Sequence, residues 1–292
     1  MQSIDSEPTP DLADRLHKLY HDASKHSVYQ SVPGFIARAR GYQEEIHSLW
    51  RSDTPRYDYI AKRIDVPRGA SIADIGANTG FFSLNIAHAR PDLSVVAYEL
   101  NPRHAEFIGL TAKAFALVHV EVRSQSCDLA GLALLPTFDT LLLLNVLHHA
   151  GFDFDHEIPD DNEAFTAHAV DYLRRLRDHA RQLVFQIGSN RGGDKARPLF
   201  PRDDDQRRLG WIAQVLRMAG WKLDHLAYAD LDDGAVIFRD APREILEAAY
   251  SGNVETPTVA SFFAGAKLAR FPGEFHRRPL VIATTEKSSQ KP

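Results

Sequence analysis

The sequence predicts an α/β fold in which a doubly wound, mostly parallel sheet of seven strands follows a helical N-terminal segment. Short β-branched stretches alternate with stretches whose apolar residues recur at helical spacing. One short apolar stretch, residues 71–75, runs directly into a turn with two glycines four residues apart, Gly76 and Gly80. Such a strand–turn–helix leaves bare backbone against which a ligand can lie.

The segment before the sheet is expected to be helical. Leu12, Leu16 and Leu19 recur at helical spacing, and Tyr42, Ile46, Leu49 and other apolar residues continue the pattern as far as Ile64. We therefore expect residues 1–68 to form a helical N-terminal cap on a core of residues 69–292.

Strands are expected at residues 71–75, 94–98, 118–122, 139–144, 182–187, 221–228 and 280–285. The last strand should run antiparallel to the others. Residues 230–278 precede it and are expected to form an insertion near the mouth of the active site. The alternative is that residues 234–238 are themselves a regular sheet strand and that the last strand lies elsewhere.

The composition excludes several classes of protein. Hydrophobic residues make up 44% of the 292 residues and charged residues 25%, as in ordinary globular proteins. The net charge of −5 gives no general attraction to nucleic acid or anionic lipid. The single cysteine, Cys127, excludes an internal disulfide framework and a cysteine-based zinc site. With no long apolar run and no secretion signal, we expect a cytoplasmic protein without a membrane span.

The glycine turn carries the most specific signal. Its residues, Asp74-Ile75-Gly76-Ala77-Asn78-Thr79-Gly80, have the spacing D-x-G-x-x-x-G, which differs from that of dinucleotide-binding loops and P-loops. The turn resembles the first loop of class I S-adenosylmethionine-dependent methyltransferases, which have a Rossmann-like fold. In that family the loop holds the methionine part of the cofactor. The resemblance implies cofactor binding by Asp74, Gly76, Asn78 and Gly80.

Three later segments fit the same resemblance, which covers about residues 69–150. Glu99, followed by Leu100, comes after the second strand, where the family places an acidic residue that accepts from both ribose hydroxyls. Asp128 lies after the third strand, where the family often contacts the adenine amino group. Asn145 lies at the exit of the fourth strand, which the family places beside the sulfonium. The implied cofactor is S-adenosylmethionine.

Two histidines are candidates for catalysis. Methyl transfer is an in-line displacement, and an oxygen or carbon nucleophile usually needs a base to take its proton. His149 and His148 follow the fourth strand, at the sheet edge where ligands bind, and imidazole titrates near neutral pH. We expect His149, and after it His148, to supply the base. The alternative is that both belong only to the cofactor wall.

The loops beyond the histidines offer further polar groups. The loop of residues 151–161 is rich in carboxylates and could bind a divalent metal, but its spacing matches no metal motif, so we expect none. Arg191, in a glycine-containing loop after the fifth strand, could bind a carboxylate or phosphate of the substrate. A solvated mobile loop is the alternative.

A second, local resemblance concerns Leu49-Trp50-Arg51-Ser52-Asp53, which is similar to a segment of the tRNA wobble-uridine carboxymethyltransferases. It implies that Arg51 reaches a carboxylate of the cofactor or substrate. Those enzymes position an arginine close after the fourth strand, whereas this chain has no arginine in residues 148–151. That difference and the acidic charge balance argue against a tRNA substrate.

The sequence thus predicts a methyltransferase for a small-molecule acceptor, with O- or C-methylation favoured and nucleic acid not expected as a partner. The cap and the insertion would enclose the acceptor. One alternative is a tRNA wobble-uridine modifying enzyme, and another is a non-catalytic, cofactor-binding partner subunit. The sequence does not indicate the oligomeric state.

Overall fold

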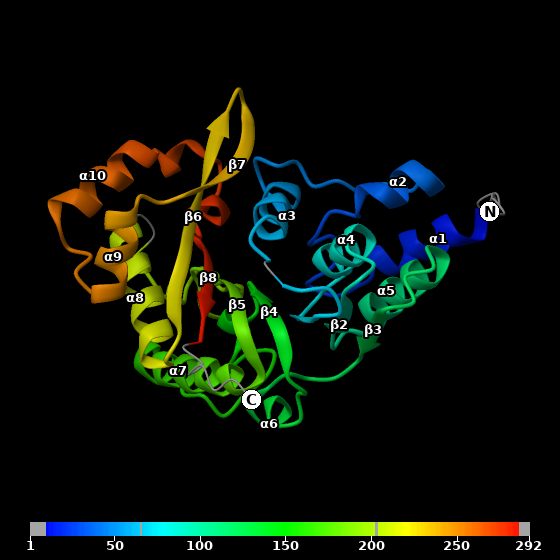
Figure 1. Ribbon diagram of the computed structural model, residues 1–292, viewed down its shortest axis with the longest axis horizontal. Helices are drawn as coiled ribbons and strands as arrows, with labels where there is room; N and C mark the ends of the chain where they lie inside the picture. Colours follow the sequence, from blue (N-terminus) through cyan, green and yellow to red (C-terminus); the bar gives the residue numbers. More distant parts are fainter. Residues whose placement is uncertain (1–9, 65, 202–203, 286–292) are drawn as a thin grey trace.

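A mixed sheet forms the centre of this computed structural model, which describes residues 10–64, 66–201 and 204–285 (Figure 1). The strand order is β3-β2-β1-β4-β5-β8-β6-β7. The first five strands pair in parallel, and β8 runs antiparallel between β5 and β6. This arrangement confirms the predicted fold class and the antiparallel last strand. The strands are β1 (Ser71–Ile75), β2 (Ser94–Tyr98), β3 (Val120–Arg123), β4 (Phe138–Leu144), β5 (Ala180–Gln186), β6 (Lys222–Asp232), β7 (Ala235–Asp240) and β8 (Leu280–Thr284).

The described part of the sheet has eight strands, one more than predicted. The additional strand, β7, pairs antiparallel with β6 through a two-residue turn at Asp233 and Gly234. Both turn residues have positive φ, 45° and 81°, which is the geometry of the Asp-Gly hairpin. The alternative that residues 234–238 form a strand was therefore correct, while the last strand stays at Leu280–Thr284 as predicted.

Helices cover the sheet, as expected because several strands are nearly continuous apolar runs and must be buried. In β4, Leu141, Leu142 and Leu143 are completely buried. α4 packs on β1, β2 and β3, α7 packs on β5, and α8 packs on β6. None of the helices in the described ranges is long and apolar enough to cross a membrane. The helices of the core are α4 (Phe81–Ala89), α5 (Pro102–Ala114), α6 (Leu129–Leu132), α7 (Asn162–His179) and α8 (Asp205–Met218).

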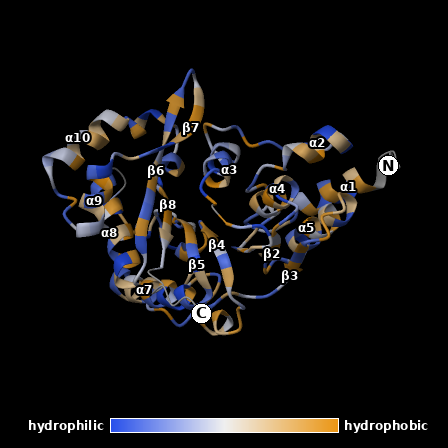
Figure 2. Cartoon of the chain, viewed as in Figure 1, coloured by the Kyte–Doolittle hydropathy of each residue, from blue (hydrophilic) through white to orange (hydrophobic). Residues whose placement is uncertain are grey.

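The N-terminal region contains three short helices, α1 (Pro10–Tyr20), α2 (Gly34–Arg40) and α3 (Asp53–Ala61). α1 packs on α5, and α3 packs on α4 and β7. Helix α1 shows both hydrophobic and hydrophilic residues in Figure 2, as expected of a helix with one buried face. The apolar residues of this region belong to the same buried cluster as those of the sheet. The predicted boundary between cap and core at residue 68 stays a prediction.

The segment between α2 and α3 is not helical, so the expectation for Tyr42, Ile46 and Leu49 was wrong. Its backbone pairs instead with the chain before α2. Val32 N–H donates to the carbonyl of Glu44 at 2.7 Å, and Ile46 N–H donates to the Ser31 hydroxyl at 3.1 Å. The apolar spacing reflects burial of single side chains along an irregular segment.

The region between β7 and β8 contains α9 (Arg243–Ser251) and α10 (Pro257–Ala266), followed by two short 3-10 turns, Leu268–Arg270 and Glu274–Arg277. Figure 1 shows α9 and α10 beside α8, at the β6–β7 side of the molecule. α9 packs on α8 and β6, and α10 packs on α8 and α9. The region therefore extends the sheet's helical layer.

Candidate functional site

A cavity of about 510 Å³ lies at the carboxyl ends of β1, β2 and β4. Strand order reverses between β1 and β4, and ligands of doubly wound sheets bind at such a switch point. The cavity wall includes the turn after β1 and the chain that follows β2, β3 and β4. The helix residues His104 of α5 and Tyr172 of α7 also line it. A further part of the wall comes from residues 22–32, which connect α1 with the approach to α2 and are called the cap segment below.

The two glycines of the turn have different surroundings. Gly76 lines the cavity with φ of 68°, and a Cβ there would lie 2.6 Å from Val146 Cγ2. Gly80 has φ of 78°, and a Cβ there would lie 2.7 Å from Ile108 Cγ1 of α5. Gly76 thus presents bare backbone to the cavity as predicted. Gly80 lies outside the cavity lining and allows α4 and α5 to approach each other.

Glu99 is fixed in the cavity wall by two backbone amides. Its Oε2 accepts from Asn78 N–H at 2.6 Å, and its Oε1 accepts from Asn101 N–H at 2.8 Å. Burial raises the pKa of Glu99 to about 7, and the two amide hydrogen bonds act against that rise. A carboxylate offers about four acceptor positions, so capacity remains for two hydroxyl donors. Leu100 lines the cavity next to it, and its side chain is exposed.

The cap segment is hydrogen-bonded to the glycine turn. Asn78 lines the cavity with a positive φ of 54°, and its Nδ2 donates to the carbonyl of His26 at 3.0 Å. The Gln30 side-chain oxygen accepts from Phe81 N–H, at the start of α4, at 3.1 Å. Lys25, His26 and Gln30 line the cavity, and sequence reasoning missed them because the segment contains no motif.

His149 lines the cavity within a polar cluster. Its Nδ1 lies 3.0 Å from Asp153 Oδ2, and His26 Nε2 lies 3.1 Å from the same oxygen. Burial lowers the pKa of His149, and Asp153 opposes that shift. Burial alone would raise the pKa of Asp153, but His149, His26 and Lys25 hold it well below its usual range. At neutral pH the site therefore offers a neutral imidazole beside an ionised carboxylate, which suits a general base.

His148 has a different environment, because it lies outside the cavity lining. Its Nδ1 accepts from Gly188 N–H at 3.3 Å, and a Cβ on Gly188 would lie 2.4 Å from the other ring nitrogen. Burial holds the pKa of His148 well below its usual value. Because the His148 ring is buried behind the cavity wall, His149 is the better candidate for the base.

Asp74 and Asp128 also lie outside the cavity lining. Asp74 is buried and accepts from the Ser83 hydroxyl at 2.6 Å. Burial raises its pKa to about 6, and the Ser83 hydrogen bond acts against that rise. Asp128 caps α6 by accepting from Gly131 N–H at 2.7 Å. Asp74 thus anchors the start of α4 through Ser83, and Asp128 caps α6. The cofactor contacts expected of these two residues stay predictions.

The wall near Asp128 comes instead from the residues just before it, Ser126 and Cys127. Burial, and after it the charge of Asp128, raises the pKa of the Cys127 thiol to about 12. This part of the wall is therefore uncharged at neutral pH.

Asn145 lines the cavity, and both polar groups of its side chain are engaged. Its Nδ2 donates to Gln186 Oε1 at 2.9 Å, and its Oδ1 accepts from Arg278 Nη1 at 2.9 Å. Its φ is 60°, so the backbone turns sharply at the end of β4. Asn145 thus fixes the course of the chain toward His149.

Comparison with known proteins links the chain to a methyltransferase family, although no protein-family model matches it. It is 32% identical over 108 residues to ribosomal RNA small subunit methyltransferase G of Salinispora arenicola (strain CNS-205), covering 36% of this chain and 44% of that protein. The resemblance predicted from sequence is thereby confirmed. The chain has the class I methyltransferase fold.

A second methyltransferase relative matches over a shorter stretch. It is the protein of the same name from Sorangium cellulosum (strain So ce56), which is 36% identical over 67 residues, or 23% of this chain and 28% of that protein. The chain thus spans less than half of the length of either of these curated relatives.

Solved structures of similar overall shape include other methyltransferases. Magnesium protoporphyrin IX methyltransferase (ChlM) from Synechocystis PCC 6803 with bound SAM is 13% identical, with 93% of this chain and 90% of that chain covered and a TM-score of 0.46. The bifunctional kinase-methyltransferase WbdD is 18% identical, with 64% and 39% covered and a TM-score of 0.45. TM-scores of 0.45 and 0.46 support no conclusion about the substrate of this chain.

The two arginines expected to bind substrate lie at different places. The Arg51 guanidinium stacks on the Tyr29 ring, with Cζ 3.2 Å from the ring centroid, and Tyr29 lines the cavity. Burial would raise the pKa of Tyr29, but Arg51 and Arg278 lower it on balance. Arg51 itself lies behind Tyr29, outside the lining of the cavity.

Arg191 lies at a second, smaller cavity of about 290 Å³. Its Nη2 pairs with Asp160 at 2.7 Å. Arg191 does not line the main cavity, and its expected contact with a substrate stays a prediction. Phe152 lines both cavities and marks where they adjoin.

The insertion does not enclose the main cavity of this methyltransferase fold. Its expected place near the active-site mouth stays a prediction, but no described residue of 230–278 lines the cavity. The physical reason is the hairpin of β6 and β7, which carries the chain toward α8. The end of the region approaches the site, where Arg278 Nη1 donates to Oδ1 of the cavity residue Asn145 at 2.9 Å.

Proposed function

We propose that the protein is an S-adenosylmethionine-dependent methyltransferase that modifies oxygen or carbon of a small-molecule acceptor. One observation carries this proposal. Gly76, Glu99 and His149 meet in one cavity and combine a bare turn, a carboxylate with free acceptor capacity and a neutral imidazole. These are the groups that an adenosyl sulfonium and a protic acceptor would need.

In this proposal each part of the cofactor has a place in the cavity. Glu99 accepts from the ribose hydroxyls, Gly76 and Asn78 hold the methionine part, and Ser126 and Cys127 contact the adenine ring. S-adenosylmethionine supplies an electrophilic methyl group. His149 accepts the proton of the acceptor, and the carboxylate of Asp153, 3.0 Å from its Nδ1, stabilises the imidazolium that forms.

A small-molecule acceptor is supported by the cavity and its cover. The cavity volume of about 510 Å³ lies within the range of roughly 300–1,000 Å³ usual for small ligands, and the acceptor must share it with the cofactor. The cap segment supplies Lys25, His26 and Tyr29 to the wall, which limits access for a polymer. The net charge of −5 gives no general attraction to RNA.

An RNA acceptor is the second candidate, because the two curated relatives are named as ribosomal RNA methyltransferases. Their similarity covers 36% and 23% of this chain, so the acceptor can differ while the cofactor site is shared. A change of acceptor on a common fold is frequent among enzymes.

Calorimetry with S-adenosylmethionine and its demethylated product tests the cofactor site, and we expect one binding site per chain. A folded protein that binds neither compound would end the proposal. Methyl-labelled cofactor, offered with a metabolite extract or with ribosomal RNA, tests the acceptor. Label recovered in a small molecule supports the main proposal, and label recovered only in RNA replaces it. Binding without transfer to either pool would indicate a non-catalytic subunit.

A further inference from the structure

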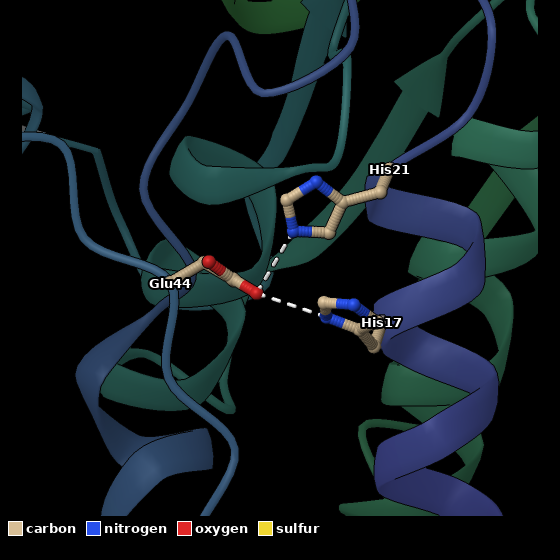
Figure 3. Close-up of side chains that lie close together, drawn as sticks. All are labelled: His17, His21 and Glu44. Carbon is tan, nitrogen blue, oxygen red and sulfur yellow. Dashed lines mark hydrogen bonds and ion pairs between the residues drawn. The ribbon is translucent and has the colours of Figure 1, made fainter.

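Two histidines and a glutamate meet on the surface of the N-terminal region, outside the lining of the cofactor cavity (Figure 3). His17 lies in the last turn of α1 and His21 directly follows the helix. His21 N–H donates to the carbonyl of His17 at 3.0 Å, so the helical turn continues and the two side chains lie on one face. Glu44 reaches them from the irregular segment after α2. Its Oε1 lies 3.1 Å from His17 Nδ1 and 3.0 Å from His21 Nε2, as Figure 3 shows.

The spacing of these three atoms suits a metal ion. Around a tetrahedral zinc with bonds of about 2.0–2.2 Å, ligand atoms lie about 3.3–3.6 Å apart. The two measured distances, 3.0 and 3.1 Å, differ from this by only a few tenths of an ångström. Imidazole nitrogen with a carboxylate oxygen is a donor set for Zn²⁺ and similar transition metals, whereas Ca²⁺ and Mg²⁺ prefer oxygen alone.

The cluster is open to solvent. The His17, His21 and Glu44 side chains are 56%, 38% and 25% exposed, so an ion can enter and water can complete its coordination. A second group with suitable spacing, His26, His149 and Asp153, lies at the cavity. There the Lys25 ammonium pairs with Asp153 and repels a cation. The surface group is therefore the better site.

We propose that His17, His21 and Glu44 form a binding site for a divalent transition-metal ion such as Zn²⁺. Without the ion, Glu44 Oε1 accepts hydrogen bonds from the two imidazoles. On binding, His17 Nδ1 and His21 Nε2 each offer a lone pair to the ion, and the proton of each neutral ring resides on its other nitrogen.

The position of this site gives it a structural consequence. His21 immediately precedes the cap segment, and the carbonyl of Glu44 accepts from Val32 N–H at its other end. An ion bound between His21 and Glu44 therefore joins the two ends of a segment that lines the cofactor cavity. Metal binding should restrict the opening of that segment.

Zinc calorimetry with matched variants tests the site on the full chain. We expect one site, with affinity reduced by at least ~10-fold in Glu44→Gln and His21→Gln, because each removes a ligand. Glu45→Gln and His47→Gln alter neighbouring side chains outside the cluster and should bind like the wild type. No zinc binding, or equal affinity in all variants, would overturn the proposal. Loss of binding in His26→Gln alone would also overturn it, by placing the ion at the cavity.

Hydrogen exchange tests the consequence without any cofactor, so its outcome does not depend on the proposed function. Zinc should slow exchange in residues 22–32 of the wild type and leave Glu44→Gln unchanged. Equal exchange rates with and without zinc in the wild type would refute the restriction of the cap segment.

Discussion

Replacing Gly76 by alanine should destabilise the protein more than its backbone conformation alone explains. Its φ of 68° lies in the left-handed region, which costs other residues about 1–2 kcal/mol. The added Cβ would also lie 2.6 Å from Val146 Cγ2, and relieving such overpacking typically costs about 1–3 kcal/mol. We therefore expect Gly76→Ala to lower the free energy of unfolding by about 2–5 kcal/mol.

Gly69→Ala is the matched control for this change. Gly69 also has a positive φ, 80°, but nothing lies within 4 Å of an added Cβ, so only the conformational cost of about 1–2 kcal/mol applies. Urea unfolding with linear extrapolation gives both free energies. Equal losses in the two variants would refute the argument, because they would mean that Val146 moves aside without cost.

Three further predictions concern ionisable groups of the site. Because the folded-state pKa of Asp74 is about 6 and the unfolded chain ionises first, the contribution of Asp74 to stability should fall by about 3 kcal/mol as pH rises from 3 to 7. In urea unfolding at several pH values, the difference in stability between Asp74→Asn and the wild type should therefore change by that amount, and a difference that does not vary with pH would refute the assignment to Asp74. Cofactor affinity should rise as pH passes through about 7, because ionised Glu99 accepts from both hydroxyls, and calorimetry on Glu99→Gln should show no such rise. His149→Gln should reduce turnover by about 10²–10⁴-fold while cofactor affinity is kept, and normal turnover would leave His149 as part of the wall.

Features set by neighbouring residues could be predicted from sequence. The strand, the turn with Gly76 and the carboxylate of Glu99 depend on short stretches with fixed spacing. The part of the cavity wall that residues 71–99 form could therefore be predicted from the sequence. The missed hairpin of β6 and β7 was also local, since Asp233-Gly234 between two strand-like stretches is a known turn signal.

Features set by distant contacts could not be predicted in this way. The cap segment is positioned by hydrogen bonds from His26 to Asn78 and from Gln30 to Phe81, over 50 residues away. The directions of the Asp128 and His148 side chains depend on the α6 N-terminus and on Gly188. The sequence predicted the correct sheet edge for both residues, but tertiary packing directs their side chains away from the cavity.

The place of β8 between β5 and β6 has a consequence for the order in which the chain folds during synthesis. The hairpin of β6 and β7 emerges first, yet it joins the sheet only through β8, which follows later. Arg278, two residues before β8, then reaches Asn145 in the cavity wall. Since chains fold from the N-terminus as they are made, β1–β5 can assemble early, whereas the wall around Asn145 is completed only when β8 docks.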